Sequence, residues 1–287
     1  MKVKDSRAWS FATIALIYAA ATLLALYVWK LCSGIPVLWS LFIADAAATV
    51  FVWAWGLVFR NVSVYDPYWS VAPPVLLTIL AAVHGAPQMS AVLAIAAVWI
   101  WAIRLTANWA YTFHGLSFED WRYTKYRTEQ HPVIFQAINF FGLNMMPTVV
   151  VYLAMLPAIS LVLDGTGNAG VLTWAGFSAS IGAAAIQFTA DRQAHAFRKD
   201  HRGQVCRTGL WKNGRHPNYF GEILMWWGVW LMYVSVEGIT KANWWYVCGA
   251  VAMTLMFRFI SVPLMERRQL ANKPDYAAYK ASTRMFI

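Results

Sequence analysis

The segment from Arg207 to Glu222 lies between two apolar stretches and contains many charged and polar side chains that could bind a ligand. Pro217 suits the first turn of a helix, where its missing N–H costs nothing. Asn218 and Glu222 are four residues apart, so both would lie on one face of that helix. The free N–H groups and the positive end of the helix dipole would face the preceding basic loop, which favours a phosphate. The side chains that could hold such a ligand are Arg207, Arg215, His216, Asn218, Tyr219 and Glu222.

A second polar series lies at the end of the preceding apolar stretch. Its members Gln187, Asp191, His195, Arg198 and Arg202 follow one another at intervals of three or four residues, so they share one face of a helix. A charged group at membrane depth costs roughly 2.5–3.5 kcal/mol and usually lines a cavity. Gln187 and Asp191 therefore indicate a ligand cavity, and the alternative is a solvated face on a helix that leaves the membrane.

A third candidate group surrounds Asp66, which lies among aromatic residues in the segment YDPYWS. Burial there would favour the protonated acid, which can polarise a carbonyl group. A helix cap flanked by interfacial aromatic residues is the alternative. Arg104 and Asn108 share one face of a later apolar stretch, and Arg104 could pair with Asp66, bind a ligand phosphate or extend to lipid headgroups. The charged groups at 119–123 and 266–268 are expected to be surface residues.

The elements that carry these residues are predicted to be membrane helices. Of the 287 residues only 13% are charged, against about 25% in a soluble domain, and the mean hydropathy is +0.47. A crossing needs about 20 apolar residues. The candidate stretches are 9–30, 38–59, 71–84, 89–111, 146–164, 171–190, 220–236 and 243–262. Because the third is short and begins near two prolines, we expect an all-α integral membrane bundle of seven or eight transmembrane helices.

The net charge of +10 is distributed unevenly along this bundle. With the N-terminus inside and eight crossings, almost all Lys and Arg residues, including Lys2 and Lys4, fall in inside segments. The positive-inside rule explains this bias, so no nucleic-acid partner is needed. The N- and C-termini are predicted to be cytoplasmic, and the long inside loops place the site on the cytoplasmic side. The chain has no evident targeting segment, so we expect a bacterial inner membrane. The exceptions to the inside bias are Lys30, Lys241, Arg104 and Arg258.

Other patterns are not predicted to carry chemistry. Cys32, Cys206 and Cys248 form neither a disulfide framework nor a metal-ligand set. The six histidines form no diiron spacing, so no metal is expected. The stretch Gly165–Gly170 fits the pattern G-x-G-x-x-G, but it lies between two apolar spans rather than in a βαβ unit, which predicts a plain turn.

The charge of the predicted cavity favours NADPH over S-adenosylmethionine as its ligand. NADPH carries a pyrophosphate and a 2′-phosphate, which arginine binds in bidentate geometry. S-adenosylmethionine is cationic at sulfur and has no phosphate. Five arginines lie between Arg192 and Arg215, more than a cationic ligand would require.

From about Val64 to the C-terminus, the chain resembles the steroid 5-alpha-reductase family, and in particular an uncharacterised bacterial branch of it. The resemblance implies one membrane domain, 1–287, in which N-terminal spans (1–63) precede a reductase-like region (64–287). In the reductases the matching positions bind NADPH. The residues that carry this resemblance, and its implied cofactor-binding roles, are Gln187, Asp191, Arg198, Asn218, Tyr219 and Glu222.

The same resemblance implies a catalytic group. Asp66 matches the place of a catalytic Glu that holds a ketone together with a Tyr. The Tyr position, three residues before Arg104, is Trp101 in this sequence, and Tyr65 or Tyr68 could take its role.

The sequence therefore predicts an NADPH-dependent oxidoreductase that reduces a carbon–carbon double bond of the enone type. Its substrate would be lipid-like or steroid-like and would enter from the bilayer, with its carbonyl near Asp66 and Trp101. The string from Arg215 to Gly221 and the later Glu266 also resemble the isoprenylcysteine and phospholipid methyltransferases, which use S-adenosylmethionine. A third possibility is a lipid-binding or scaffolding protein whose basic loops hold anionic headgroups. No obligate protein partner is evident.

Overall fold

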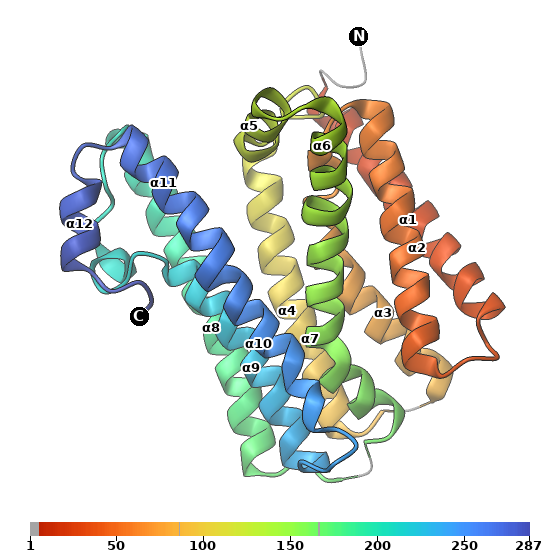
Figure 1. Cartoon of the computed structure of the whole chain (residues 1–287). Helices are drawn as coiled ribbons and strands as arrows, with labels where there is room; N and C mark the ends of the chain where they lie inside the picture. The colour runs from red at the N-terminus through yellow and green to blue at the C-terminus, as the bar shows by residue number, and fades with distance from the viewer. Residues whose placement is uncertain (1–5, 86, 166) are drawn as a thin grey trace. The chain divides into compact units, whose positions relative to one another are not determined.

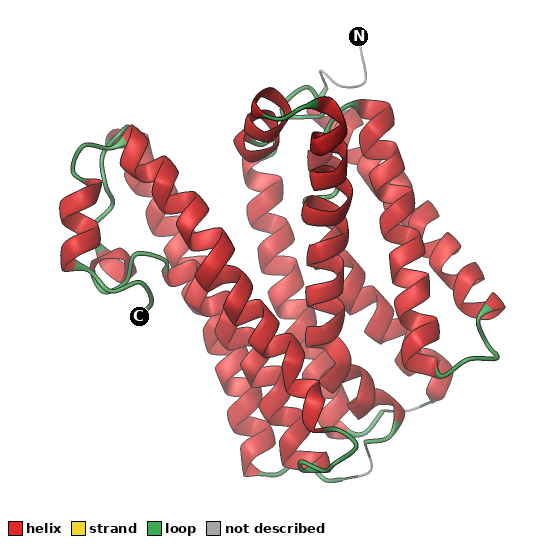
Figure 2. Ribbon diagram, viewed as in Figure 1, coloured by secondary structure: helices red, strands yellow, loops and turns green. Residues whose placement is uncertain are grey.

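Every regular element in the described part of the chain is a helix. The computed structural model describes residues 6–85, 87–165 and 167–287, and no strand occurs in these ranges (Figure 2). The prediction of an all-helical fold is confirmed. Lys2, Lys4 and Thr166, which belong to the predicted inside charge and to the predicted glycine turn, lie outside the described residues.

Among the described residues, seven segments are long and apolar enough to cross a membrane, which indicates an integral membrane protein. They cover seven of the eight stretches predicted from the sequence. The eighth stretch lies in α9 (Pro217–Glu237), a helix of 21 residues whose hydropathy is lowered by Trp and Tyr and by Glu222. The seven segments are Arg7–Leu31, Val37–Phe59, Val62–His84, Met89–Thr112, Pro132–Leu163, Val171–Asp200 and Trp244–Asn272.

The chain forms two compact units, each of which is described by itself. Unit 1 holds the chain up to Leu76 together with Leu105–Tyr152. Unit 2 holds Leu77–Arg104 together with Leu153–Ile287. The boundaries fall inside three helices, α3 (Tyr68–His84), α4 (Met89–Thr112) and α7 (Met146–Leu163).

Unit 1 is organised around two long neighbouring helices. α1 (Arg7–Leu31) and α2 (Val37–Phe59) pack side by side (Figure 1). Ser6 caps the start of α1 because its side chain accepts a hydrogen bond from the N–H of Trp9. α2 ends where Arg60 adopts the left-handed conformation. Unit 1 also contains η2 (Val62–Val64), α5 (Trp121–Glu129), α6 (Pro132–Ala137), η3 (Ile138–Met145) and the adjoining parts of α3, α4 and α7.

Unit 2 is organised around α8 (Val171–Asp200) and α9, which pack against each other along their length (Figure 1). With 30 residues, α8 extends for about 45 Å. The hydrocarbon core is only about 30 Å thick, so part of this helix must project beyond it. The other elements are η4 (Gly209–Lys212), η5 (Trp244–Val247), α10 (Cys248–Met256), η6 (Phe257–Ser261), α11 (Val262–Asn272) and α12 (Tyr276–Ser282).

Glycines allow α8 and α9 to approach closely. A Cβ added at Gly228 would lie 2.7 Å from the carbonyl oxygen of Gly176 and 2.3 Å from Oγ of Ser180. A Cβ at Gly221 would lie 2.5 Å from Cγ of Gln187. Small residues at such contacts let the backbones of membrane helices pack together. The absence of side chains at these two glycines therefore places Gln187 directly against α9.

The variant Gly228→Ala is expected to lower the free energy of unfolding by about 1–3 kcal/mol, because the new methyl group overpacks a backbone contact. Gly182→Ala on α8 is the matched control, since a Cβ there meets nothing within 4 Å. The control should be neutral or stabilising by up to about 1 kcal/mol, owing to the helix propensity of Ala. Unfolding in mixed micelles measures both values, and equal effects of the two variants would contradict the packing described here.

Candidate functional site

A partly buried arginine, Arg104, joins three helices of unit 2. Nη1 of Arg104 donates to Oδ2 of Asp191 over 2.9 Å, and Nη2 donates to Oε1 of Gln187 over 2.5 Å. Nη2 also lies 3.7 Å from Oε2 of Glu222. The third nitrogen of the guanidinium, Nε, is buried and has no hydrogen-bond partner in the part of the chain that the structure describes. One guanidinium thus holds two carboxylates and an amide together.

The Glu222 carboxylate is the second centre of this network. Nε1 of Trp101 donates to both of its oxygens over 2.8 and 2.9 Å. Trp226 donates through Nε1 over 3.2 Å, and Gln187 through Nε2 over 2.8 Å. Only 3% of Glu222 is exposed, so these donors replace the water that a carboxylate needs. The arrangement fixes the side chain of Glu222 without solvent.

Helical spacing brings the members of this network together. Each of the three helices contributes two residues one turn apart, which then face the same neighbour. They are Trp101 and Arg104 from α4, Gln187 and Asp191 from α8, and Asn218 and Glu222 from α9. Nδ2 of Asn218 lies 3.4 Å from Oδ1 of Asp191 and completes the connection between α8 and α9. The two polar series recognised in the sequence therefore form one cluster.

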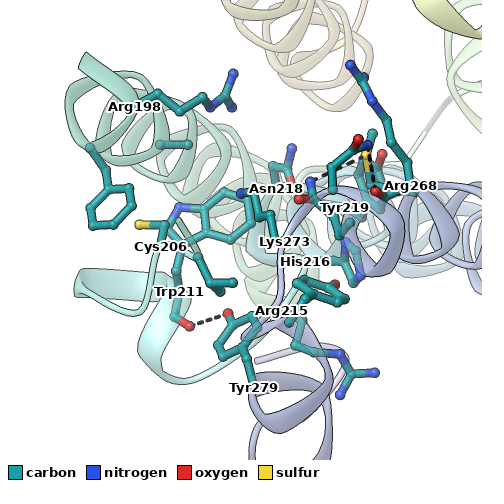
Figure 3. A pocket seen from close by; sticks show the side chains of 17 residues that line it. Arg198, Cys206, Trp211, Arg215, His216, Asn218, Tyr219, Arg268, Lys273 and Tyr279 are labelled. Carbon is teal, nitrogen blue, oxygen red and sulfur yellow. Dashed lines mark hydrogen bonds between the residues drawn. The ribbon is translucent and has the colours of Figure 1, made fainter. Parts of the chain in front are cut away.

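A cavity of about 410 Å³ opens beside this cluster, still within unit 2 (Figure 3). Its wall comes from the end of α8, the start of α9, the connection between them, and α11 and α12. Asn218 belongs both to the cavity wall and to the buried cluster. Four cationic side chains line the cavity, and no Asp or Glu occurs among its described lining residues. These cations are Arg198, Arg215, Arg268 and Lys273.

One of these cations is neutralised by a buried carboxylate. Nε of Arg215 lies 2.8 Å from Oε1 of Glu266, which also lies 3.2 Å from Nε2 of His216. Nζ of Lys280 reaches the other oxygen, Oε2, over 2.8 Å. Arg215 further donates to the carbonyl oxygens of Lys280 and Thr283. Arg215 thus connects the C-terminal segment to the start of α9, and we call this contact the junction.

The backbone and the ring of His216 belong to the same junction. The N–H groups of Arg215 and His216 donate to the carbonyl oxygens of Arg284 and Met285 over 2.9 and 3.1 Å. Burial lowers the pKa of His216, and its hydrogen bond with Glu266 opposes that shift. The ring stacks on Tyr219 with an interplanar angle of 7°. The junction therefore presents Tyr219 and Asn218 to the cavity from a rigid support.

The other cations keep the cavity wall positively charged. Neither Arg198 nor Lys273 forms an ion pair with a carboxylate among the described residues. Burial lowers the pKa of Lys273, and repulsion from Arg198 and Arg268 adds to that shift. Crowded cations of this kind cost free energy unless an anion binds among them.

The structure places the remaining predicted residues elsewhere. Arg207 is exposed, donates to the carbonyl oxygen of Asp275 over 3.0 Å, and does not line the cavity. In unit 1, the hydroxyl of Tyr65 bonds Oγ1 of Thr148 over 2.7 Å. Tyr68, also in unit 1, donates to Oδ1 of Asp45 over 3.1 Å.

Asp66 accepts a short hydrogen bond from Tyr123, within unit 1. Burial raises the pKa of Tyr123 well above its usual value, and the Asp66 charge adds to that rise. Tyr123 therefore keeps the proton that it donates. Trp101, the other residue predicted to be catalytic, belongs to unit 2 and its indole N–H is engaged by Glu222.

Lys273 and Asp45 were not singled out in the sequence, and Glu266 was named only through the resemblance to the methyltransferases. Glu266 was expected at the surface, and this was wrong, because it is 4% exposed and pairs with Arg215. Lys273 was placed only in a cytoplasmic tail. Asp45 was not singled out, although a lone carboxylate inside an apolar stretch is itself a signal of function.

The variant Arg104→Met is expected to lower the free energy of unfolding by about 3–5 kcal/mol, because it leaves buried carboxylates without their cation. Glu222→Gln removes one of those charges, so the double variant should be less unstable than the sum predicts, with a coupling of about 0.5–3 kcal/mol. Arg258→Met, at an exposed arginine of η6, is the control and should change stability by no more than about 0.5 kcal/mol. Strictly additive effects of Arg104→Met and Glu222→Gln would refute the shared network.

Comparison with known proteins identifies one family. The family described as protein of unknown function (DUF1295) matches residues 52–283. This range includes the whole buried cluster and all the lining residues of the cavity. Comparisons with curated proteins and with solved structures find no match. Because the match covers most of the chain, the protein belongs to the DUF1295 family.

Proposed function

We propose that the cavity of unit 2 binds NADPH and that the protein is an NADPH-dependent reductase of a carbon–carbon double bond in a lipid-like substrate. The observation that supports this most is the charge of the cavity wall. Four cations and no acidic residue line it, in the part of the chain that the structure describes. A ligand with several phosphates complements such a wall, whereas a sulfonium ligand does not.

The size and the polar groups of the cavity fit a nucleotide. Its volume of about 410 Å³ lies in the range of about 300–1,000 Å³ that is usual for small-molecule and cofactor sites. Arg198 and Lys273 would bind phosphate, the arginine in bidentate geometry. The amide side chains of Asn218, Gln269 and Asn272 would bind ribose hydroxyl or carboxamide groups.

Aromatic side chains complete the wall. Phe197, Trp211 and Tyr279 line the cavity and offer ring faces on which a base can stack. Burial raises the pKa of Tyr276 to about 12, so its phenol stays protonated and can donate a hydrogen bond. These groups would hold the adenine end of a dinucleotide away from water.

When bound, NADPH supplies a hydride to an activated carbon–carbon double bond. The residues of the chain would bind and orient it. The Arg104–Asp191 pair holds Asn218 at the cavity wall. Glu222 orients the amide of Gln187 in the buried cluster. The catalytic roles of Asp66, Trp101, Tyr65 and Tyr68 stay predictions.

The sidedness of the protein is part of the same proposal. We assign the cavity and both termini to the cytoplasmic side of a bacterial inner membrane. The cations of the long segments at 192–216 and 263–287 support this assignment through the positive-inside rule. It requires α9 to count as an eighth crossing, and its 21 residues are sufficient for that.

A methyltransferase is the second candidate. Arg215, His216 and Glu266, which carry the resemblance to the methyltransferases, form one ion-paired cluster. This observation favours a shared architecture of the junction. The cationic wall argues against a cationic cosubstrate, so we rank this candidate second.

Cys206 provides a direct test, because this thiol lines the cavity and is partly exposed. In a Cys32→Ser, Cys248→Ser background, NADPH should slow the alkylation of Cys206 by a maleimide. S-adenosylhomocysteine should not slow it. Protection by S-adenosylhomocysteine alone would favour the methyltransferase. Protection by neither NADPH nor S-adenosylhomocysteine would contradict both enzyme proposals and favour a lipid-binding role.

The variants Arg198→Ala and Lys273→Ala are each expected to raise the Kd for NADPH by about 10- to 100-fold. The reason is the loss of a charged hydrogen bond worth about 1.5–3 kcal/mol. Lys199→Ala is the matched control, because Lys199 follows Arg198 on α8, is exposed and does not line the cavity. Isothermal titration of the purified protein in micelles measures the three values. An unchanged Kd for NADPH in Arg198→Ala would contradict the proposal that NADPH binds in this cavity.

A further inference from the structure

Unit 1 contains a carboxyl group deep within a membrane helix. Asp45 lies eight residues after the start of α2, or about 12 Å along the helix axis. It is 8% exposed, and none of the ion pairs among the described residues involves it. Its hydrogen-bond partner is the hydroxyl of Tyr68, at 3.1 Å. A charge in such a place is costly, and carrying a proton removes that cost.

A series of buried hydroxyl groups leads away from Asp45. The hydroxyl of Tyr68 is hydrogen-bonded to Thr49, one turn beyond Asp45 on α2. Oγ1 of Thr49 lies 2.9 Å from Oγ1 of Thr148 on α7, which lies 2.7 Å from the hydroxyl of Tyr65. All these side chains belong to residues that are at least nine-tenths buried. In the last two links either atom can be the donor.

A wide helical turn positions the middle of this series. The π-helix η3 directly precedes α7, and Oγ1 of Thr148 donates to the carbonyl oxygen of Asn144 within it over 3.1 Å. The side chain of Asn144 is itself held by Asn139, five residues earlier, through bonds of 2.8 and 3.0 Å. Such π-turns occur often at functional sites. Thr148 has one hydroxyl proton, so it accepts from Thr49 and Tyr65 while it donates to Asn144, and its hydroxyl rotates away from Asn144 when it passes a proton along the series.

A second carboxyl group lies at the other end of the series. Asp66 follows Tyr65 in the chain, is partly exposed and acts electrostatically on the Tyr65 hydroxyl. Tyr123 of α5 fixes it through a short hydrogen bond. The series thus runs from a partly exposed acid to a buried one.

We propose that the hydroxyls of Tyr65, Thr148, Thr49 and Tyr68 form a proton wire to Asp45, and that a bridging water molecule connects the entrance of this wire at Tyr65 with Asp66. A hydroxyl can donate and accept at the same time, which proton transfer along a chain requires. In one passage Asp66 releases a proton to a bridging water molecule, the water and each hydroxyl accept one proton and pass on one of their own, and Asp45 receives one. The net change is one proton moved from Asp66 to Asp45, and no hydroxyl changes its charge.

A catalytic use of the proton that reaches Asp45 rests on the proposed reductase function. The existence of the wire does not depend on that function. Reduction of a carbon–carbon double bond adds one hydride and one proton, so each turnover consumes one proton. A buried acid that is reprotonated through a wire is a source of protons that admits no water to the apolar interior.

Proton exchange at Asp45 tests the wire without any nucleotide. Infrared spectroscopy of the protein in lipid nanodiscs should detect a protonated carboxyl band that is absent in Asp45→Asn. On transfer to heavy water, the shift of this band gives the exchange rate. Thr148→Val should slow the exchange about tenfold or more, because a positioned transfer group is lost. Thr148→Ser keeps a hydroxyl and should retain the fast rate.

Ser40→Ala is the matched control, because Ser40 is a buried hydroxyl on α2 that donates to Val37 of its own helix. It should leave the exchange rate unchanged. Thr49→Val provides a second break in the wire if Thr148→Val does not fold. The proposal fails if no band is lost in Asp45→Asn, or if both Val variants exchange at the wild-type rate. NADPH titration of Asp45→Asn should give the wild-type Kd, so a failure of nucleotide binding would be seen separately.

Discussion

The Arg104 guanidinium is the interaction on which the rest of unit 2 depends. It lies among side chains of α8 and α9 at a depth where each carboxylate would be unstable alone. Because Asp191 and Glu222 share this cation, the helices that carry them are held in one register. The glycines at 221 and 228 permit the close approach that the register needs. Asn218, which is hydrogen-bonded to Asp191 and lines the cavity, connects this arrangement to the cavity wall.

The acidic and basic side chains of unit 2 are distributed in a way that suits an anionic ligand in the cavity. Asp191 and Glu222 form ion pairs with Arg104, and Glu266 forms an ion pair with Arg215. Acidic side chains therefore bind the protein's own cations, and the cavity wall keeps Arg198 and Lys273. A surface that only holds lipid headgroups would not need the two buried carboxylates of Glu222 and Glu266 behind it.

Local signals in the sequence predicted a large part of this architecture. Apolar length predicted the spans, Pro217 predicted the start of α9, and helical spacing predicted that Gln187 and Asp191 share a face. Glu266 could not be assigned in this way, because its partner Arg215 is far away in the chain and only tertiary packing brings them together. Asp45 differs, since its isolation in an apolar helix was visible in the sequence, but its hydroxyl partner, Tyr68, comes from α3.

The most direct test of the account is an experimental structure determined with saturating NADPH. Phosphate density is expected within hydrogen-bond distance of Arg198 and Lys273, with the cofactor in contact with Asn218. Density for the cofactor at any other place, or a cavity without cofactor under conditions of measured binding, would contradict it.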